Sequence, residues 1–249
     1  MKKHLLVVIL LCCSALAAAQ EIVVAAASDL SSVFPGVAAR FEQETGRKVT
    51  LNFGSSGQFL LQIENGAPID IFFSADLQYP QRLESEGLTQ PGSFYKYAVG
   101  KLVLYVPNGS AVDPSQGLRA LLSPQVRKIA IANPQHAPYG RAAEAALRSM
   151  GLYESVEKKL VLGENISQTL QFIQSGAADT GIVALSLAVA PNVRGQGRYW
   201  EVPRESYPKM EQGGVILKDS PAAREFRDWL LAPAGRGLLK QYGFFLPGD

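Results

Sequence analysis

The sequence has few of the side chains that most often carry covalent or metal chemistry. Its 249 residues include two cysteines, two histidines, two tryptophans and three methionines. Both cysteines and the first histidine lie among the first 13 residues, so His136 is the one histidine beyond them. The rest of the chain therefore excludes disulfides, cysteine nucleophiles and zinc sites built from Cys and His. A Ser-His-Asp triad would have only His136 as its base.

The first 19 residues are typical of a secretory signal peptide. Lys2 and Lys3 begin the segment, an unbroken apolar run follows over residues 5–13, and alanines at 17–19 allow cleavage after Ala19. The apolar run is shorter than the roughly 18 to 20 residues that a membrane span needs. Neither cysteine follows the small residue that lipoprotein processing prefers. We therefore expect residues 1–19 to be removed and the mature protein to be periplasmic.

Neither basic nor acidic residues are in clear excess. The full chain has 24 basic and 22 acidic residues, and losing Lys2 and Lys3 leaves 22 of each. A neutral chain without basic runs or an aromatic-basic pattern is not expected to bind nucleic acid. The length and the 47% apolar content are enough for one large or two small globular domains with real cores.

Short apolar strands alternate with amphipathic helices along the chain. The patterns predict strands at 21–27, 49–53, 70–74, 97–106, 128–132, 159–162, 180–184, 199–202 and 214–218, and helices at 34–44, 59–64, 77–85, 139–150, 166–175, 222–231 and 235–242. This alternation is typical of parallel sheets covered by helices on both faces. We expect two α/β lobes, the first from 20–99 and 204–249 and the second from 100–203. The strands at 97–106 and 214–218 are the expected crossings between them.

Four strand-to-helix junctions share small residues, hydroxyls and free N–H groups: residues 27–29, 54–58, 133–140 and 163–167. Open α/β sheets bind ligands beyond the carboxyl ends of their strands. Helix starts with serines can hold an anion without a counter-charge. Each junction alone is also explained as a helix cap. Taken together they favour an anion site, and Asp29 should point away from it or cap the helix, because a carboxylate repels an anion. Arg40, Lys101 and Arg141 are conceivable cationic clamps that no spacing demands.

Several stretches look familiar when they are taken in order. They are residues 23–28 (Val-Val-Ala-Ala-Ala-Ser), 53–57 (Phe-Gly-Ser-Ser-Gly), 63–76, which contain Gly-Ala-Pro-Ile-Asp-Ile-Phe-Phe-Ser-Ala-Asp, 132–140 (Ala-Asn-Pro-Gln-His-Ala-Pro-Tyr-Gly), 163–166 and 181–186. Along nearly the whole mature chain the sequence resembles the molybdate-binding proteins of bacterial molybdate ABC importers. The resemblance implies a two-lobed type II periplasmic binding protein fold, each lobe a mostly parallel sheet flanked by helices, joined by two hinge strands.

The same resemblance implies a function without catalysis or cofactor. A monomer captures molybdate or tungstate in the cleft and delivers it to a membrane permease with a cytoplasmic ATPase. Carried over by position, Ser28 and Ser56 donate through hydroxyl and backbone N–H, and Tyr139 and Ile166 donate backbone N–H. These residues bind the oxyanion by hydrogen bonds and are not direct metal ligands.

One donor of the family pattern is missing. Some members have a tyrosine after Gly-Ile-Val, where this sequence has Ala184. Asn165 or the side chain of Tyr139 are candidate replacements, and Ser55 is a further possible contact. Asp70 and Asp76 are expected to fix loops rather than touch the ligand.

Two other functions remain open from the sequence. The same fold binding sulfate or another oxyanion is the closer alternative. A site of donors alone should reject protonated oxyanions, which need an acceptor, whereas sulfate must be rejected by size. A secreted serine hydrolase using Ser28 or Ser56 is the remote alternative, because the chain lacks a Gly-x-Ser-x-Gly motif and offers only His136 as base.

Overall fold

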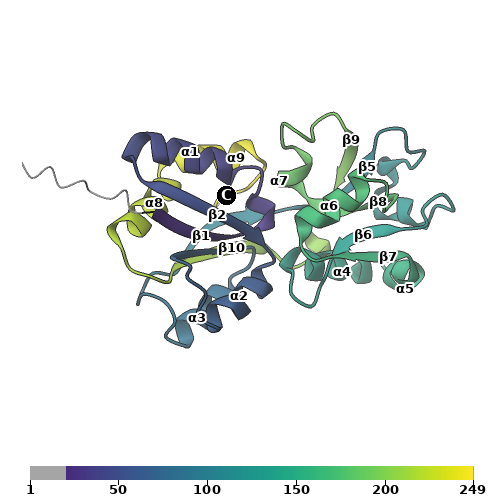
Figure 1. The fold of residues 1–249 in the computed structure, drawn as a ribbon. Coiled ribbons are helices and arrows are strands. Elements are labelled where there is room, and N and C mark those ends of the chain that lie inside the picture. The colour runs from purple at the N-terminus through teal and green to yellow at the C-terminus, as the bar shows by residue number, and fades with distance from the viewer. Residues whose placement is uncertain (1–20, 249) are drawn as a thin grey trace, which may run out of the picture.

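The computed structural model describes residues 21–248. The predicted signal peptide lies outside these residues. Two lobes stand side by side, each built on its own five-stranded sheet (Figure 1). Within the described residues no helix is long and apolar enough to cross a membrane.

The first lobe contains the sheet β2-β1-β3-β10-β4. Its strands and helices are β1 (Glu21–Ala27), β2 (Lys48–Gly54), β3 (Ile71–Ser74), β4 (Tyr95–Gly100), β10 (Met210–Ile216), α1 (Phe34–Thr45), α2 (Ser56–Glu64), α3 (Gln78–Ser85), α8 (Pro221–Leu231) and α9 (Pro233–Gln241). Side chains alternate between the two faces of the sheet, as a strand buried on both sides requires. In β1, Val24 and Ala26 pack with α1, α8 and α9, while Ala25 packs with α2 and α3 on the other face.

The second lobe contains the sheet β7-β6-β8-β5-β9. Its elements are β5 (Leu102–Pro107), β6 (Ile129–Ala132), β7 (Leu160–Gly163), β8 (Thr180–Ala184), β9 (Gly197–Glu201), α4 (Pro138–Ser149), α5 (Tyr153–Val156), α6 (Ile166–Gln174) and α7 (Leu185–Ala188). Ala27 and Ala75 of the first lobe pack against the core of this lobe. The core of the second lobe therefore extends to the ends of β1 and β3 in the first lobe.

Both sheets are mixed. β1 runs parallel to β2 and β3, and β6 runs parallel to β7 and β8, as the alternation of strands and helices predicts. β10 is antiparallel to β3 and β4, and β5 is antiparallel to β8 and β9. A parallel pair needs a crossover connection, which is usually a helix. The chain enters β5 and β10 directly from the other lobe, so these strands are free to run antiparallel.

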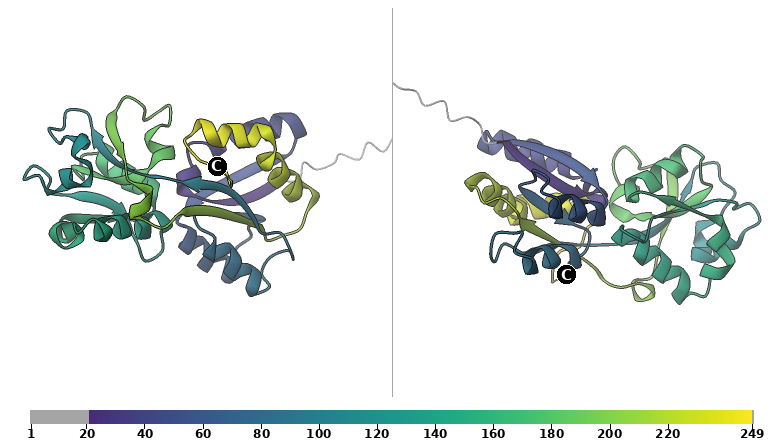
Figure 2. Two further views of the ribbon diagram at one scale, coloured as in Figure 1. Left: turned by 180° about the vertical axis from the view of Figure 1, so that it is seen from behind. Right: turned by 60° about the horizontal axis from the view of Figure 1, so that its bottom comes forward.

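The chain passes between the lobes twice, and Figure 2 shows both connections. The first is Lys101, which divides the expected strand over 97–106 into β4 and β5. The second is the segment 202–209 between β9 and β10. The expectation that residues 214–218 form a crossing was wrong, because β10 lies between β3 and β4 inside the first sheet. Its apolar residues reflect burial within a sheet. The expected lobe boundaries, after residues 99 and 203, lie beside the two connections.

Helix boundaries follow local signals. α1 ends at Gly46, as predicted, where a φ of 73° suits glycine and the N–H donates to the carbonyl of Glu42. α2 begins at Ser56, three residues before the expected start at Phe59, because Ser56 and Gly57 form its first turn.

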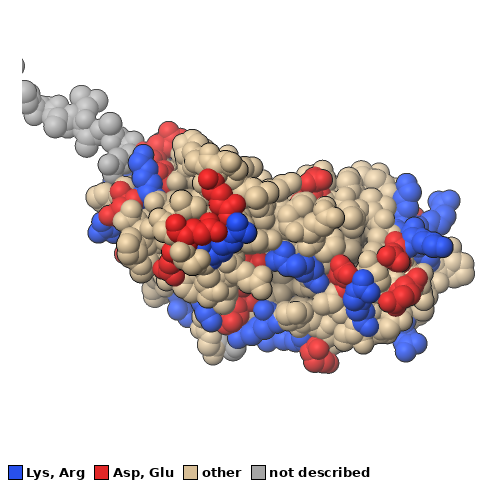
Figure 3. All heavy atoms as spheres, turned by 90° about the horizontal axis from the view of Figure 1, so that it is seen from below, with Lys and Arg blue, Asp and Glu red and all other residues tan. Residues whose placement is uncertain are grey.

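Basic and acidic side chains are interspersed over both lobes on the face shown in Figure 3.

Candidate ligand-binding site

A small cavity lies where the two lobes meet. Its volume is about 10 Å³, and all four predicted junctions contribute to its lining. The lining residues are Ala27, Ser28, Asp29, Gly54, Ser55, Ser56 and Ala75 from the first lobe and Ala137, Pro138, Tyr139, Asn165 and Ile166 from the second. This space is on the order of what one water molecule needs. Any ligand larger than a water molecule therefore requires the lobes to move apart from this arrangement.

The structure brings six of the seven candidate residues to this cavity. Ser28, Ser55, Ser56, Tyr139, Asn165 and Ile166 all line it. Ala184 does not line it, because it is the last residue of β8, pairs with Leu102 of β5 and is fully buried in the second lobe.

Two serine hydroxyls at the cavity keep their protons available. The Ser56 hydroxyl accepts the N–H of Ala75 at 3.0 Å, and the Ser28 hydroxyl accepts the N–H of Ser167 at 3.4 Å. Both serines are buried. Since each oxygen acts as an acceptor in these bonds, each hydroxyl can still donate its hydrogen to a ligand.

Three helices begin at the cavity. Ser56 opens α2, Tyr139 follows Pro138 in the first turn of α4, and Ile166 opens α6. The N–H groups of a first turn have no carbonyl partner inside their own helix, and the helix dipole makes them favourable for an anion. Asn165 caps α6 through its side-chain oxygen, which accepts the Gln168 N–H at 3.0 Å. Only the amide nitrogen of Asn165 remains as a side-chain donor.

Gly57 allows the close approach of the lobes. Its N–H donates to the carbonyl of His136 at 3.0 Å. A Cβ at this position would lie 2.7 Å from that carbonyl oxygen and 2.8 Å from the hydroxyl of Tyr79. Any larger residue would therefore hold α2 away from the second lobe.

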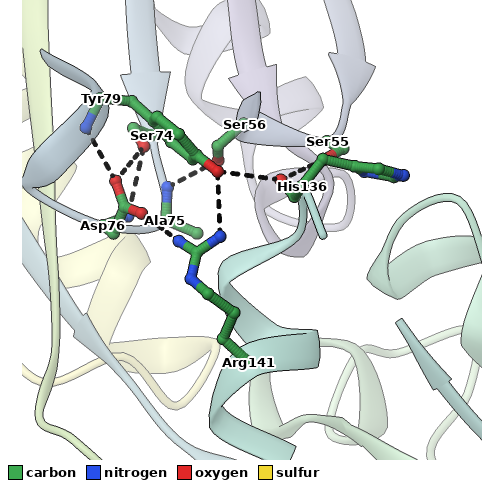
Figure 4. Close-up of polar contacts among 8 residues, drawn as sticks. All are labelled: Ser55, Ser56, Ser74, Ala75, Asp76, Tyr79, His136 and Arg141. Atoms are coloured by element: carbon green, nitrogen blue, oxygen red, sulfur yellow. Dashed lines mark hydrogen bonds and ion pairs between the residues drawn. The ribbon is translucent and has the colours of Figure 1, made fainter. Parts of the chain in front are cut away.

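The hydroxyl of Ser55 makes a contact between the lobes and is not free to donate to a ligand. Its hydroxyl donates to the carbonyl of His136 at 2.6 Å, and its oxygen lies 2.9 Å from Nδ1 of the same residue (Figure 4). With the hydroxyl proton given to the carbonyl, Nδ1 must be the donor in the second bond. His136 Nε2 lies 3.5 Å from the carboxylate of Glu164. The imidazole thus donates to Ser55. Among the described residues no hydrogen bond joins His136 to Ser28 or Ser56, the serines of the hydrolase alternative, so this geometry does not favour that alternative.

Asp29 contradicts the sequence expectation. It lines the cavity and is 1% exposed, so the junctions do contain a buried carboxyl. It does not cap a helix. Oδ2 accepts the hydroxyl of Tyr139 at 3.0 Å and the amide of Gln212 at 2.6 Å, and Oδ1 is buried without a hydrogen bond. Burial raises the pKa of Asp29 from 3.8 to about 7, against the lowering effect of Gln212 and Tyr139. The two polar partners, together with burial, hold the side chain at the interface.

The hydroxyl of Tyr139 is committed to this cluster. It lies 3.3 Å from Nε2 of Gln212 as well as bonding to Asp29. Gly100 makes the arrangement possible, because a Cβ there would lie 2.3 Å from the Tyr139 hydroxyl. Tyr139 therefore does not supply the hydroxyl missing at Ala184. The sequence analysis missed Gln212, since nothing local connects a residue of β10 with a junction 183 positions earlier.

Comparison with known families decides the class of the protein. Residues 22–245 match the family model of the bacterial extracellular solute-binding proteins. The chain belongs to this family. The match covers both lobes and the cavity between them.

Individual relatives of this solute-binding protein are molybdate-binding proteins, so the resemblance seen in the sequence is confirmed. The molybdate-binding protein ModA of Azotobacter vinelandii is 43% identical over 213 residues, which cover 84% of each chain. The protein of the same name from Rhodobacter capsulatus is 39% identical over 211 residues, 84% of this chain and 81% of that one. The solved periplasmic molybdate-binding protein of Azotobacter vinelandii superposes with a TM-score of 0.85 and 35% identity, covering 91% of this chain and 99% of that chain.

The two prominent aspartates of this solute-binding protein hold loops, as expected. Asp70 accepts the N–H of Val23 at 2.8 Å. Asp76 accepts the N–H of Tyr79 and also contacts Arg141 of the other lobe. Neither aspartate belongs to a metal site, since the described residues contain no group of three or more His, Cys, Asp or Glu that could hold a metal ion.

Proposed function

We propose that this solute-binding protein captures molybdate or tungstate in the cavity between its lobes. The observation that carries the proposal is the convergence of three helix starts and two serine hydroxyls on one small cavity. The residues that line it include no Lys, Arg or His. Such a site suits a compact anion, because oriented dipoles stabilise its charge without forming an ion pair.

In the proposed complex the donors come from both lobes. Ser28 and Ser56 donate through hydroxyl and backbone N–H, and Tyr139 and Ile166 donate through backbone N–H. Asp29 stands beside these donors, and a pKa of about 7 allows it to be neutral when the dianion is bound. The relatives named as molybdate-binding proteins support molybdate over sulfate as the ligand.

The proposal extends to location and partner. The leader at residues 1–19 is removed after Ala19, and the mature monomer works in the periplasm. It passes its oxyanion to an ABC permease driven by a cytoplasmic ATPase. No catalysis or cofactor is part of the proposal, because the ligand is bound and released unchanged.

Titration calorimetry of the mature protein with molybdate, tungstate, sulfate and phosphate tests the function. We expect molybdate and tungstate to bind at micromolar concentration or below, and sulfate and phosphate to bind much more weakly. A parallel thermal-shift series should rank the anions in the same order, since a ligand of the folded state raises its apparent stability. Binding of sulfate without binding of molybdate or tungstate would favour the alternative oxyanion. Heat from none of the four would contradict an oxyanion site.

A further inference from the structure

An ion pair joins the two lobes beside the cavity. Nη2 of Arg141, on α4, lies 2.5 Å from Oδ2 of Asp76, which follows β3 in the first lobe. Nη1 of Arg141 donates to the hydroxyl of Tyr79 at 2.9 Å, and the guanidinium carbon lies 5.3 Å from the centre of that ring. Figure 4 shows the guanidinium reaching across the interface to both residues.

Hydrogen bonds within the first lobe hold Asp76 in place independently of Arg141. Oδ1 of Asp76 accepts the hydroxyl of Ser74 at 3.1 Å and the N–H of Tyr79 at 3.2 Å. Ser74 is fully buried, and its carbonyl accepts the hydroxyl of Tyr97. These bonds turn Oδ2 toward the second lobe. The Asp76 side chain is 17% exposed and the Arg141 side chain 37%, so the pair is shielded from solvent mainly on the Asp76 side.

The ion pair is coupled to the cavity on both sides. Ala75, next to Asp76, lines the cavity and donates its N–H to Ser56. Tyr139, two residues before Arg141, lines the cavity from the first turn of α4. A movement that separates Ser56 from Tyr139 must therefore also separate Asp76 from Arg141.

Arg141 itself is outside the small cavity. It lines a separate cavity of about 480 Å³, together with Asp76, and Ala75 and Pro138 border both spaces. The charged pair thus lies on the outer side of the wall that encloses the small cavity. We therefore expect no contact between Arg141 and a ligand in the small cavity.

Most of the other hydrogen bonds that cross the interface near the cavity are neutral, and the exceptions are the amide of Gln58, which donates to the carboxylate of Glu164 at 2.8 Å, and the hydroxyl of Tyr139, which donates to Asp29. Gly57 and Ser55 donate to the carbonyl of His136, and the hydroxyl of Ser167 donates to the carbonyl of Ser28 at 2.8 Å. Charge-assisted hydrogen bonds are roughly twice as strong as neutral ones. The Arg141 contact is therefore expected to add to the polar attraction between the closed lobes, while burial, which raises the pKa of Asp76 against the lowering effect of Arg141, offsets part of it.

We propose that Arg141 is a latch residue which, through Asp76 and Tyr79, holds the lobes closed and sets the rate at which the bound oxyanion leaves. The inference rests on the proposed function. The cavity is too small to hold molybdate in this arrangement of the lobes, so the anion enters and leaves as the lobes move, and a hinge motion is the movement that opens the cavity. Arg141 acts on release as a positioning residue and not as a ligand contact.

Dissociation of labelled molybdate, chased with an excess of unlabelled molybdate, measures the latch directly. In the mature protein, Arg141→Gln and Asp76→Asn should each raise the dissociation rate about 5- to 20-fold. The double variant should be no faster than the faster single variant, because both changes remove one interaction. Tyr79→Phe should raise the rate roughly twofold. The association rate should change little.

Arg148→Gln is the matched control. Arg148 lies on the same helix, but its partners Glu144 and Glu154 belong to the same lobe. Its removal should leave the dissociation rate unchanged. Equal rates for the Arg141 and Arg148 variants would overturn the latch.

Asp76→Asn separates the latch from a simple attraction between Arg141 and the anion. If Arg141 acted by attraction, removal of the neighbouring negative charge would slow release, and that result would overturn the proposal. A latch predicts faster release. Higher ionic strength should also accelerate release from the wild type more than from Arg141→Gln. A wild type that binds no molybdate would overturn the proposed function and the latch with it, whereas binding with an unchanged Arg141→Gln rate overturns the latch alone.

Discussion

The two halves of the cavity offer a ligand different kinds of donor. The first lobe presents side-chain hydroxyls from Ser28 and Ser56, the helix start of α2 at Ser56, and a buried carboxyl, Asp29. The second lobe presents the first-turn N–H groups of Tyr139 and Ile166, while the Tyr139 hydroxyl is committed to Asp29. Ordinary side-chain substitutions can therefore remove the hydroxyl donors of the first lobe, whereas in the second lobe they reach only the amide of Asn165. Testing the N–H donors of the second lobe requires changes to the backbone.

The largest effect should come from preventing the two halves from meeting. Gly57→Val places a branched side chain where even a Cβ would lie 2.7 Å from the His136 carbonyl oxygen. We expect molybdate affinity to fall by roughly 4 kcal/mol, because overpacking a tight contact holds the lobes apart. Calorimetry measures the affinity. The melting temperature without ligand should change little, since the backbone clash is with His136 of the other lobe, and the clash within the first lobe is with the hydroxyl at the end of the Tyr79 side chain. A large drop would point to a folding defect instead.

A proline can remove a donor from the second lobe. Ile166 is the first residue of α6, and the preceding Asn165 has an extended conformation with φ −154° and ψ 176°. Both features allow proline at 166 without breaking the helix. Ile166→Pro should weaken molybdate binding by about 3 kcal/mol, because it replaces an N–H that points at a charged ligand with a methylene group.

Ile166→Val is the control for the proline variant. It keeps the N–H and most of the buried side chain, so calorimetry should find an affinity close to that of the wild type. Equal weakening by valine and proline would mean that packing, and not the backbone donor of the second lobe, holds the ligand.

The first-lobe hydroxyls should matter somewhat less. Ser28→Ala and Ser56→Ala should each weaken molybdate binding by about 1 to 3 kcal/mol, the range for losing a hydrogen bond to a charged group. Water can take the place of a lost hydroxyl more easily than that of a lost N–H. Calorimetric titration of each variant gives the measurement. An unchanged affinity in both variants would exclude these hydroxyls as ligand contacts.

The carboxyl of the first lobe should make binding depend on pH. Asp29 has a pKa of about 7 in the folded protein, and its neighbours Tyr139, Gln212 and Tyr97 are neutral. A bound dianion favours the protonated carboxyl, so binding should take up a proton above pH 7. Affinity for molybdate should fall by about 1.4 kcal/mol, or tenfold, between pH 6 and pH 8. Calorimetry in buffers with different ionisation enthalpies counts the proton taken up.

Asp29→Asn should abolish this pH dependence, and a wild-type affinity that is constant from pH 6 to pH 8 would contradict it.

The same group should affect the stability of the folded protein. Its pKa is higher in the folded protein than the ordinary 3.8, so the folded state binds more protons between about pH 4 and 7. The free energy of unfolding should therefore fall as the pH rises through that window, and should level off above it. Urea unfolding of the wild type and of Asp29→Asn measures the difference.

The difference between the two halves also marks what the sequence could predict. The junctions after β1, β2, β6 and β7 were found because a strand, a Ser- or Gly-rich turn and a helix start are neighbours in sequence. Ser56 and Ile166 were therefore expected at the site from local pattern and from resemblance, and both line the cavity.

Contacts that depend on how the lobes face each other were not predictable. Gln212 reaches Asp29 across 183 positions, and Arg141 reaches Asp76 across 65. Repulsion between an anion and a carboxylate was a sound reason to expect Asp29 to point away. It failed because burial raises the pKa of that carboxyl to about 7, so charge is not fixed by residue type. Similarly, the apolar pattern of β10 did not reveal in which lobe the strand is buried.

The smallest effect should come from Ser55, the serine that contacts the other lobe. Its hydroxyl donates to the His136 carbonyl at 2.6 Å, and the same carbonyl also accepts the Gly57 N–H at 3.0 Å. Ser55→Ala should therefore weaken molybdate binding by less than about 1 kcal/mol, since the carbonyl keeps a donor. Ser56→Ala makes the same chemical change one residue later, so calorimetry on the pair isolates which hydroxyl faces the ligand. If Ser55→Ala weakened molybdate binding as much as Ser56→Ala, the contact between the lobes would matter as much for affinity as the contact with the anion. The Ser56 hydroxyl would then not be distinguished as the ligand contact at this junction.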